Sequence, residues 1–262
     1  MVVLCIGEPN CLSGEARSRT EICIQEVQMK LFRAVAAANE NIVSVIYGGR
    51  PLDLVEVSQK SKAVLFTWLP GSLGGEGVAD LLFGRAYPSA KLSITMPYNV
   101  GQCPIYYNCL PTNKGFGQRG SFFSSHYMDA PTTPLYPFGH GLTYTKFEYS
   151  DITLSSDKLT KNSTITASVT ITNVGKCEGS EVVQMYIHDV AATLISRPIK
   201  ELKGFEKITL APGQSKTVSF EINEPMLRFY NADMQYASEK GKFDLFIGES
   251  SASNKITSFE LV

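Results

Sequence analysis

Two glutamates follow the first apolar stretch of the chain, at places that suit acid–base chemistry. Glu8 comes directly after the apolar residues 2–6, and Glu15 follows a few residues later, between Gly14 and Ala16. A carboxyl group flanked by small residues can reach a substrate without steric competition, as a general acid must. Parallel sheets carry their functional loops beyond the carboxyl ends of the strands. This position makes Glu15 the candidate catalytic residue.

The charged neighbours of Glu15 offer a second interpretation. Arg17 and Arg19 follow within four residues, and a solvated glutamate on a loop commonly pairs with such side chains. The spacing alone leaves both interpretations open.

Other segments that resemble catalytic motifs predict structure rather than chemistry. The glycine-rich residues 71–77 lack the lysine of a phosphate-binding loop and the spacing of a dinucleotide fingerprint, so they predict a turn before a helix. His140 has no carboxylate or cysteine near it in sequence and predicts a turn histidine. Serine-hydrolase and zinc-protease motifs are absent from the sequence. We therefore expect no cofactor and no metal.

The cysteines show neither a paired CxxC motif nor metal-ligand spacing. We expect buried or incidental thiols, with a single disulfide, such as Cys103 to Cys109, as the alternative. The six residues are Cys5, Cys11, Cys23, Cys103, Cys109 and Cys177.

The periodicity of residues 1–97 predicts a partial α/β sandwich with a mostly parallel sheet. Continuous apolar runs alternate with helical stretches, an order typical of parallel sheets covered by helices on both faces. The first run opens at residue 2, with no signal peptide before it, so we expect a truncated sheet and a chain that begins inside a domain. The expected strands are residues 2–6, buried on both faces, 42–47, 63–68 and 92–96, and the expected helices are residues 27–38 and 76–83.

Residues 98–146 predict a long, ordered connection that wraps over a neighbouring surface. Glycine, proline, asparagine and serine are frequent and no period persists, yet the aromatic residues are too many for a disordered linker. They are Tyr98, Tyr106, Tyr107, Phe122, Phe123, Tyr127, Tyr136, Phe138 and Tyr144.

Residues 147–262 predict an antiparallel β-sandwich of the fibronectin type III or immunoglobulin class. Apolar and polar residues alternate over 165–172, as in a strand with one buried and one wet face. Turn residues at 173–175, 211–213 and 239–241 separate further strand-like runs. Those runs are residues 182–187, 217–222 and 242–248.

Composition excludes two classes of function. The net charge of −1 provides no basic field for nucleic acid, and no apolar run reaches the roughly 18 residues of a membrane span. We expect neither a nucleic-acid partner nor a membrane-spanning segment.

Collinear motifs along nearly the whole chain resemble the C-terminal half of glycoside hydrolase family 3, particularly its bacterial periplasmic β-glucosidases. In the first half they are GEPNCLSGEARSRTEI, VIYGGRPL, FTWLPGSLGGEGVADLLFGRAYPSAKLSITMP and VGQCPIYYN. Towards the C-terminus they are PLYPFGHGLTYTKFEYSDI, EVVQMYIHD, RPIKELKGFEKITLAPGQSKTVSF and GKFDLFIGESS.

The resemblance implies a retaining glycosidase built of a (β/α)8 barrel, an α/β sandwich and a fibronectin type III-like domain. In such enzymes the barrel carries the aspartate nucleophile, and the α/β sandwich carries the glutamate acid/base. The latter corresponds to Glu15 here, with Glu8 as the rival. The barrel and the first sandwich strands are missing from this sequence, so no nucleophile is assigned and we expect the chain alone to be inactive. The implied substrate is a β-linked glucoside or xyloside, and the implied location of the intact parent is periplasmic or secreted.

A non-catalytic binding or structural module is the alternative function. A glycan-binding face should show two or three exposed aromatic residues in a row. The sandwich offers Tyr149, Tyr186, Tyr230 and Tyr236 but no tryptophan, because Trp68 lies in the first half. This composition disfavours a lectin.

Overall fold

The first part of the chain forms a small parallel sheet. The computed structural model describes residues 1–111, 126–190 and 195–262. Strands β1 (Val2–Gly7), β2 (Ile42–Tyr47) and β3 (Ala63–Trp68) pair in parallel in the order β1-β2-β3. The prediction of a fourth strand at residues 92–96 is wrong. Met96 there forms an isolated antiparallel bridge with Tyr136, because its backbone bonds to the connection and not to the sheet.

Helices cover one face of this sheet. Helix α1 (Glu26–Ala38) and the unpredicted α2 (Val55–Lys60) place Met29, Phe32 and Val57 in one cluster with Leu4 and Ile6. Val3 and Cys5 point to the opposite face of β1 and are exposed. Burial of β1 on both faces was therefore a wrong expectation, although Val45 of β2, the register partner of Cys5, is fully buried.

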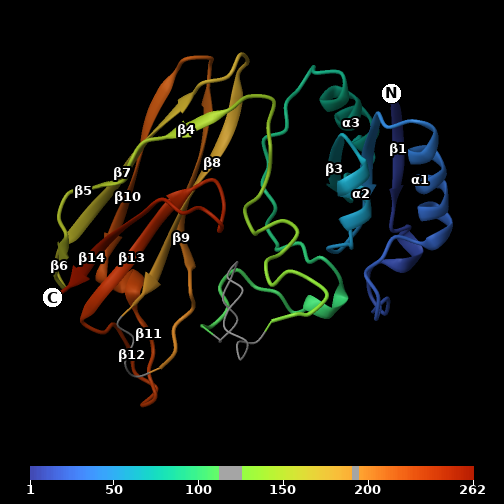
Figure 1. Cartoon of the computed structure of the whole chain (residues 1–262). Helices are drawn as coiled ribbons and strands as arrows, with labels where there is room; N and C mark the ends of the chain where they lie inside the picture. The colour runs from blue at the N-terminus through green and yellow to red at the C-terminus, as the bar shows by residue number, and fades with distance from the viewer. Residues whose placement is uncertain (112–125, 191–194) are drawn as a thin grey trace.

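A turn precedes helix α3 (Gly74–Leu82), as predicted, but it ends at residue 73, and residues 74–77 belong to the helix. The connection then runs between the sheet and the sandwich (Figure 1) and includes the short 3-10 helix η2 (Val100–Gln102). Tyr107 stacks on Phe138 and meets Tyr186 of the sandwich edge-on, with ring centroids 4.4 and 5.7 Å apart. Phe122 and Phe123 lie outside the described residues.

Ion pairs and hydrogen bonds join the segment after α3 to the sandwich. Lys91 Nζ lies 2.8 Å from the buried carboxylate of Glu181, and Lys207 Nζ of β9 (Glu201–Leu210) donates to the Ser89 hydroxyl at 2.9 Å. Desolvation by burial raises the pKa of Glu181, against the opposing effect of Lys91. His140 lies in a turn, as predicted, and stacks on Tyr136.

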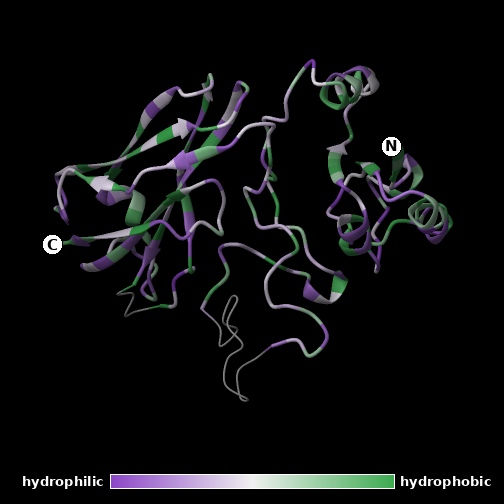
Figure 2. Cartoon of the chain, turned by 45° about the horizontal axis from the view of Figure 1, so that its top comes forward, coloured by the Kyte–Doolittle hydropathy of each residue, from purple (hydrophilic) through white to green (hydrophobic). Residues whose placement is uncertain are grey.

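The second part of the chain is an antiparallel sandwich, and its strands alternate between hydrophobic and hydrophilic residues (Figure 2). One sheet has the order β10-β7-β4, with β5 paired to β7, and the other has the order β6-β14-β13-β8-β9. Among the described strands of the sandwich, β6 and β14 alone pair in parallel. The first sheet holds β4 (Phe147–Tyr149), β5 (Thr153–Leu154), β7 (Thr164–Asn173) and β10 (Ser215–Asn223). The second holds β6 (Lys158–Leu159), β8 (Gly179–Asp189), β9 (Glu201–Leu210), β13 (Gly241–Gly248) and β14 (Ile256–Leu261).

The inward residues of both sheets form the larger core of the molecule. Ile165, Val169 and Ile171 of β7 face Val183 and Leu245 of the other sheet. Beyond β10 come the 3-10 helix η3 (Glu224–Leu227) and a small hairpin made of β11 (Phe229–Tyr230) and β12 (Tyr236–Ala237).

The cysteines form no disulfide. None of the six is disulfide-bonded, so the alternative pairing of Cys103 with Cys109 is not formed. None of the described helices has the length and hydrophobicity that a bilayer span requires.

Candidate active site

Three loops meet at the carboxyl edge of the parallel sheet. The segment after β1 carries Glu8 and Glu15, the segment after β2 carries Arg50, and β3 ends at Trp68. The backbone N–H of Gly48 donates to the Trp68 carbonyl at 3.2 Å and joins the second and third loops. Parallel strands end at one edge, so residues far apart in sequence are neighbours here.

Glu8 is a buried anion held by two arginines. Its side chain is 1% exposed, and its Oε1 lies 3.0 Å from Arg50 Nε and 3.3 Å from Arg19 Nη1. Both guanidinium groups are partly exposed, at 23% and 21%. A carboxylate removed from water is stable only when charged partners replace the lost hydration. Glu8 is therefore fully engaged within the protein.

Arg50 links this buried anion to the loop that follows. Its Nη2 donates to the carbonyl oxygens of Leu12 and Arg17, both at 2.9 Å. One guanidinium thus ties the two ends of the segment 12–17 together and anchors both to Glu8. The planar fork of arginine suits this role, because it holds several donors in fixed directions. We call this arrangement of Glu8, Arg50 and residues 12–17 the loop clamp.

Glu15 lies at the outer turn of the clamped loop. Its side chain is exposed, and no ion pair or hydrogen bond of its carboxylate is found among the residues that the structure describes. Arg19 pairs with Glu8 instead, and Arg17 donates to the Ala16 carbonyl. The surface-paired interpretation of Glu15 is therefore not observed.

The backbone around Glu15 is in an uncommon conformation. Gly14 and Ala16 on its two sides have φ of +102° and +56°. Trp68, at the end of the third strand, has φ of +56° as well. A side-chain-bearing residue in this region costs of order 1–3 kcal/mol, and such residues cluster at functional sites. Two of them lie at this one edge of the sheet.

Two glycines allow the loops to approach one another. A Cβ on Gly7, which has φ of +148°, would collide with the Tyr47 backbone, and a Cβ on Gly49 would collide with the Ser13 hydroxyl. The Gln28 side chain from α1 pairs with both the N–H and the C=O of Gly7 at 2.8 Å. Helix α1 thereby fixes the direction in which the chain leaves β1.

The sequence interpretation singled out Glu8 and Glu15 but did not include Arg50. The signal for Arg50 was its place directly after the second strand, at the same sheet edge. Groups of three or more histidine, cysteine, aspartate or glutamate side chains with metal-site geometry are absent from the described part of the chain. The clamped loop presents the carboxyl group of Glu15 at the surface.

Comparison with known proteins identifies the family. Residues 1–144 match the glycosyl hydrolase family 3 C-terminal domain, and residues 181–251 match a fibronectin type III-like domain. The chain belongs to glycoside hydrolase family 3. A periplasmic beta-glucosidase of Salmonella typhimurium is 48% identical over 263 residues, which cover 100% of this chain and 34% of that protein. A putative beta-xylosidase of Formosa agariphila is 42% identical, covering 89% of this chain and 30% of that protein.

Solved structures of the family agree with this fold. A beta-glucosidase from Listeria innocua, in complex with glucose, superposes with a TM-score of 0.93 at 40% identity. The match covers 99% of this chain and 36% of that one. The chain therefore spans about a third of the length of these relatives. An α/β domain followed by a fibronectin type III-like β-sandwich is the architecture shown.

Proposed function

We propose that this chain is the C-terminal portion of a retaining β-glucosidase-type glycoside hydrolase, to which it contributes Glu15 as the acid/base. The observation that carries the proposal is the division of roles between the two glutamates. Glu8 is buried and paired with two arginines, whereas Glu15 is exposed on a loop held by that pair. Family membership supports the reaction class.

The retaining mechanism needs two carboxylates about 5–5.5 Å apart. One attacks the anomeric carbon and forms a glycosyl-enzyme intermediate. The Glu15 carboxyl group first donates its proton to the departing glycosidic oxygen, and its carboxylate then takes a proton from the water that hydrolyses the intermediate. The nucleophile comes from a part of the intact enzyme outside this chain, by the family resemblance an N-terminal barrel domain. The chain alone is then inactive.

The substrate is a β-linked glucoside or xyloside. The names of the Salmonella and Formosa relatives, a beta-glucosidase and a putative beta-xylosidase, support this class. The Salmonella protein is described as periplasmic, which supports a periplasmic or secreted location for the intact parent.

The first test uses the isolated chain with 4-nitrophenyl β-glucoside. We expect no turnover, because the second carboxylate is absent. Glu15→Ala serves as the control for contaminating glycosidases, whose activity it leaves unchanged. Turnover that disappears in Glu15→Ala would refute the dependence on a second domain.

The second test joins the chain to the N-terminal portion of a close relative and measures Glu15→Ala. The rate of glycosylation by a dinitrophenyl glucoside, whose leaving group needs little protonation, should fall least in this variant. The rate with cellobiose should fall roughly 10²–10⁴-fold. Azide should rescue deglycosylation and give a β-glycosyl azide, since it needs no base.

Glu8→Gln and Glu8→Ala are the controls for this assignment. They should slow the activated and the unactivated substrate equally and show no azide rescue. The assignment moves to Glu8 if those variants show the leaving-group dependence and Glu15→Ala remains near wild type.

A further inference from the structure

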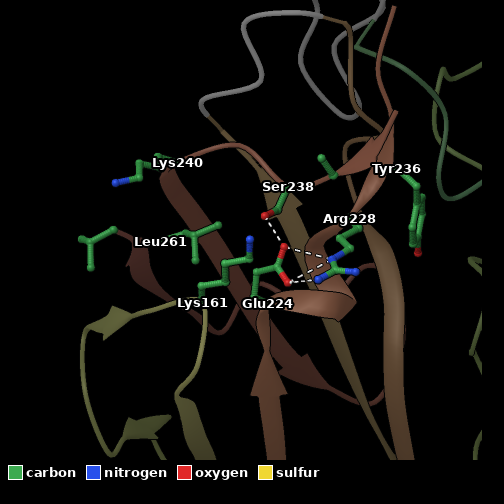
Figure 3. A pocket seen from close by; sticks show the side chains of 9 residues that line it. Lys161, Glu224, Arg228, Tyr236, Ser238, Lys240 and Leu261 are labelled. Carbon is green, nitrogen blue, oxygen red and sulfur yellow. Dashed lines mark hydrogen bonds and ion pairs between the residues drawn. The ribbon is translucent and has the colours of Figure 1, made fainter. Parts of the chain in front are cut away.

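A second candidate site lies on the sandwich, where the β11–β12 hairpin meets the end of β14 (Figure 3). It is an open cavity of about 400 Å³, within the roughly 300–1,000 Å³ of small-molecule pockets. Figure 1 shows this hairpin on the far side of the molecule from β1. The residues that matter for its chemistry are Lys161, Glu224, Arg228, Tyr236, Ser238 and Lys240.

The only carboxylate side chain lining the cavity is fully engaged. Glu224 is buried and accepts hydrogen bonds from two nitrogens of the Arg228 guanidinium. Arg228 Nε donates to Oε1 at 3.0 Å and to Oε2 at 2.9 Å, and Nη2 donates to Oε2 at 2.7 Å. Ser238 adds a hydrogen bond to Oε1 at 2.6 Å. These bonds, with that of Arg228 foremost, hold the pKa of Glu224 below its usual range. Glu224 remains an anion and orients Arg228.

The cavity therefore has an excess of positive side-chain charge. Lys161 and Lys240 line it together with Arg228, against the side-chain carboxylate of Glu224 and the terminal carboxylate of Val262. Within the described residues, neither lysine takes part in an ion pair. Figure 3 shows Lys161 beside Glu224 and Lys240 at the upper rim. Such a group of cations attracts one anionic group.

One exposed aromatic ring, that of Tyr236, lines the same cavity, and Tyr230 lies against it in the hairpin. Tyr230 and Tyr236 oppose each other in the β11–β12 hairpin, with ring centroids 5.1 Å apart, and are 61% and 54% exposed. The other tyrosines expected to line a glycan-binding face are unavailable, because Tyr186 is buried and the Tyr149 hydroxyl lies inside the protein. An exposed aromatic pair beside polar groups is typical of a binding surface rather than of a folding core.

We propose that this cavity binds a hexuronate residue of a saccharide. The sugar carboxylate lies among Lys161, Arg228 and Lys240, and the apolar C–H face of the sugar ring packs on Tyr236. A polyanion such as nucleic acid is disfavoured, since the cations form one local group and the chain carries a net charge of −1. A neutral sugar would leave the cations without a counter-charge.

The test is titration of the full chain with methyl β-D-glucuronide at low salt, followed by ¹H–¹⁵N NMR. We expect shifts confined to residues near 161 and 228–240. Methyl β-D-glucoside has the sugar ring without the carboxylate, and acetate has the carboxylate without the ring. Each should bind at least about fivefold more weakly than the glucuronide. Inorganic phosphate and a short oligonucleotide complete the set of probes.

Variants at exposed positions separate the contribution of the lysine charges from that of the Tyr236 ring. They leave the ion pair between Glu224 and Arg228 in place. Lys161→Ala with Lys240→Ala should weaken the glucuronide about tenfold, and Tyr236→Ala should weaken it about 2–10-fold while leaving acetate unchanged. Lys30→Ala and Tyr106→Ala, also exposed but located elsewhere, are the matched controls.

The alternatives give different outcomes, and each overturns the proposal. Equal binding of the glucoside would indicate a neutral-sugar site. Equal binding of acetate or phosphate, with no dependence on Tyr236, would indicate a general anion site. Tighter binding of the oligonucleotide would indicate nucleic acid, and absence of shifts at this cavity would exclude a site. The measurement involves no catalysis, so its result is independent of the role of Glu15.

Discussion

Removing the buried anion of the loop clamp should destabilise the parallel sheet and release the loop that carries Glu15. Breaking a buried ion pair by deleting one partner costs about 3–5 kcal/mol. In Glu8→Ala water can reach the two arginines, which are 21% and 23% exposed. We therefore expect the low end of that range, about 3 kcal/mol. Glu8→Gln keeps the shape but loses the charge, and should cost about 1.5–3 kcal/mol, the contribution of hydrogen bonds to charged groups.

The single tryptophan provides a local assay for this effect. Trp68 ends β3, beside the clamp, so its fluorescence during urea unfolding follows the parallel sheet, while circular dichroism follows mainly the sandwich. At about 1–3 kcal/mol per molar urea, a loss of 3 kcal/mol moves the fluorescence midpoint by about 1–3 M. The matched control is Glu26→Gln, whose carboxylate pairs with Arg33 but is 63% exposed. It should cost less than about 1 kcal/mol.

Two results would refute this reasoning. One is a Glu8→Ala midpoint that moves no further than that of Glu26→Gln, which would mean that the clamp contributes no stability. The other is trypsin cleavage after Arg17 that is no faster in Glu8→Ala than in wild type at a urea concentration where both are folded. That result would mean that Glu8 does not hold the loop.

Three further predictions concern the loop approach, a buried histidine and the relative stability of the two parts. Gly49→Ala should lower the fluorescence midpoint because its methyl group meets the Ser13 hydroxyl. Adding Ser13→Ala should restore part of the lost midpoint. A double variant whose midpoint shift equals the sum of the two single shifts would contradict the contact. Burial lowers the pKa of His140, so its contribution to stability is present above about pH 6.5 and is lost as the pH falls through the lower folded value. His140→Gln should flatten that limb of Tm against pH, whereas parallel curves for wild type and His140→Gln would disprove the role. The sandwich should be more stable than residues 1–97, so limited proteolysis should leave a resistant fragment that begins near Phe147. Residues 1–97 resisting cleavage longer than the sandwich would contradict this prediction.

Strand positions could be predicted from the sequence because the signal is local. The run at 63–68 coincides with β3, and the alternation at 165–172 lies within β7. Strands β9 and β14 were missed. In β9 the residues Gly204 and Glu206 interrupt the apolar alternation, and only its end, Ile208 and Leu210, is buried.

The apolar run at 92–96 shows the limit of a local pattern. It has the composition of a strand, but its partner is chosen by tertiary structure: Met96 bonds to Tyr136, forty residues away, and leaves the sheet without a fourth strand. The site has the same limitation. Glu8 and Arg50 are 42 residues apart, and only the common edge of parallel strands brings them together. The sequence shows that both glutamates follow the first strand but could not distinguish them, since burial is a property of the fold.

That difference in burial also explains why one loop needs two glutamates. A buried carboxylate with two arginine side chains at 3.0 and 3.3 Å is held by charged hydrogen bonds and makes a rigid anchor. A general acid needs other surroundings, low polarity or a second carboxylate that favours the protonated form. Glu15 is exposed in the described structure. In the proposed enzyme, those surroundings must come from the domain that carries the nucleophile, so that the acid becomes competent only when both carboxylates are in place.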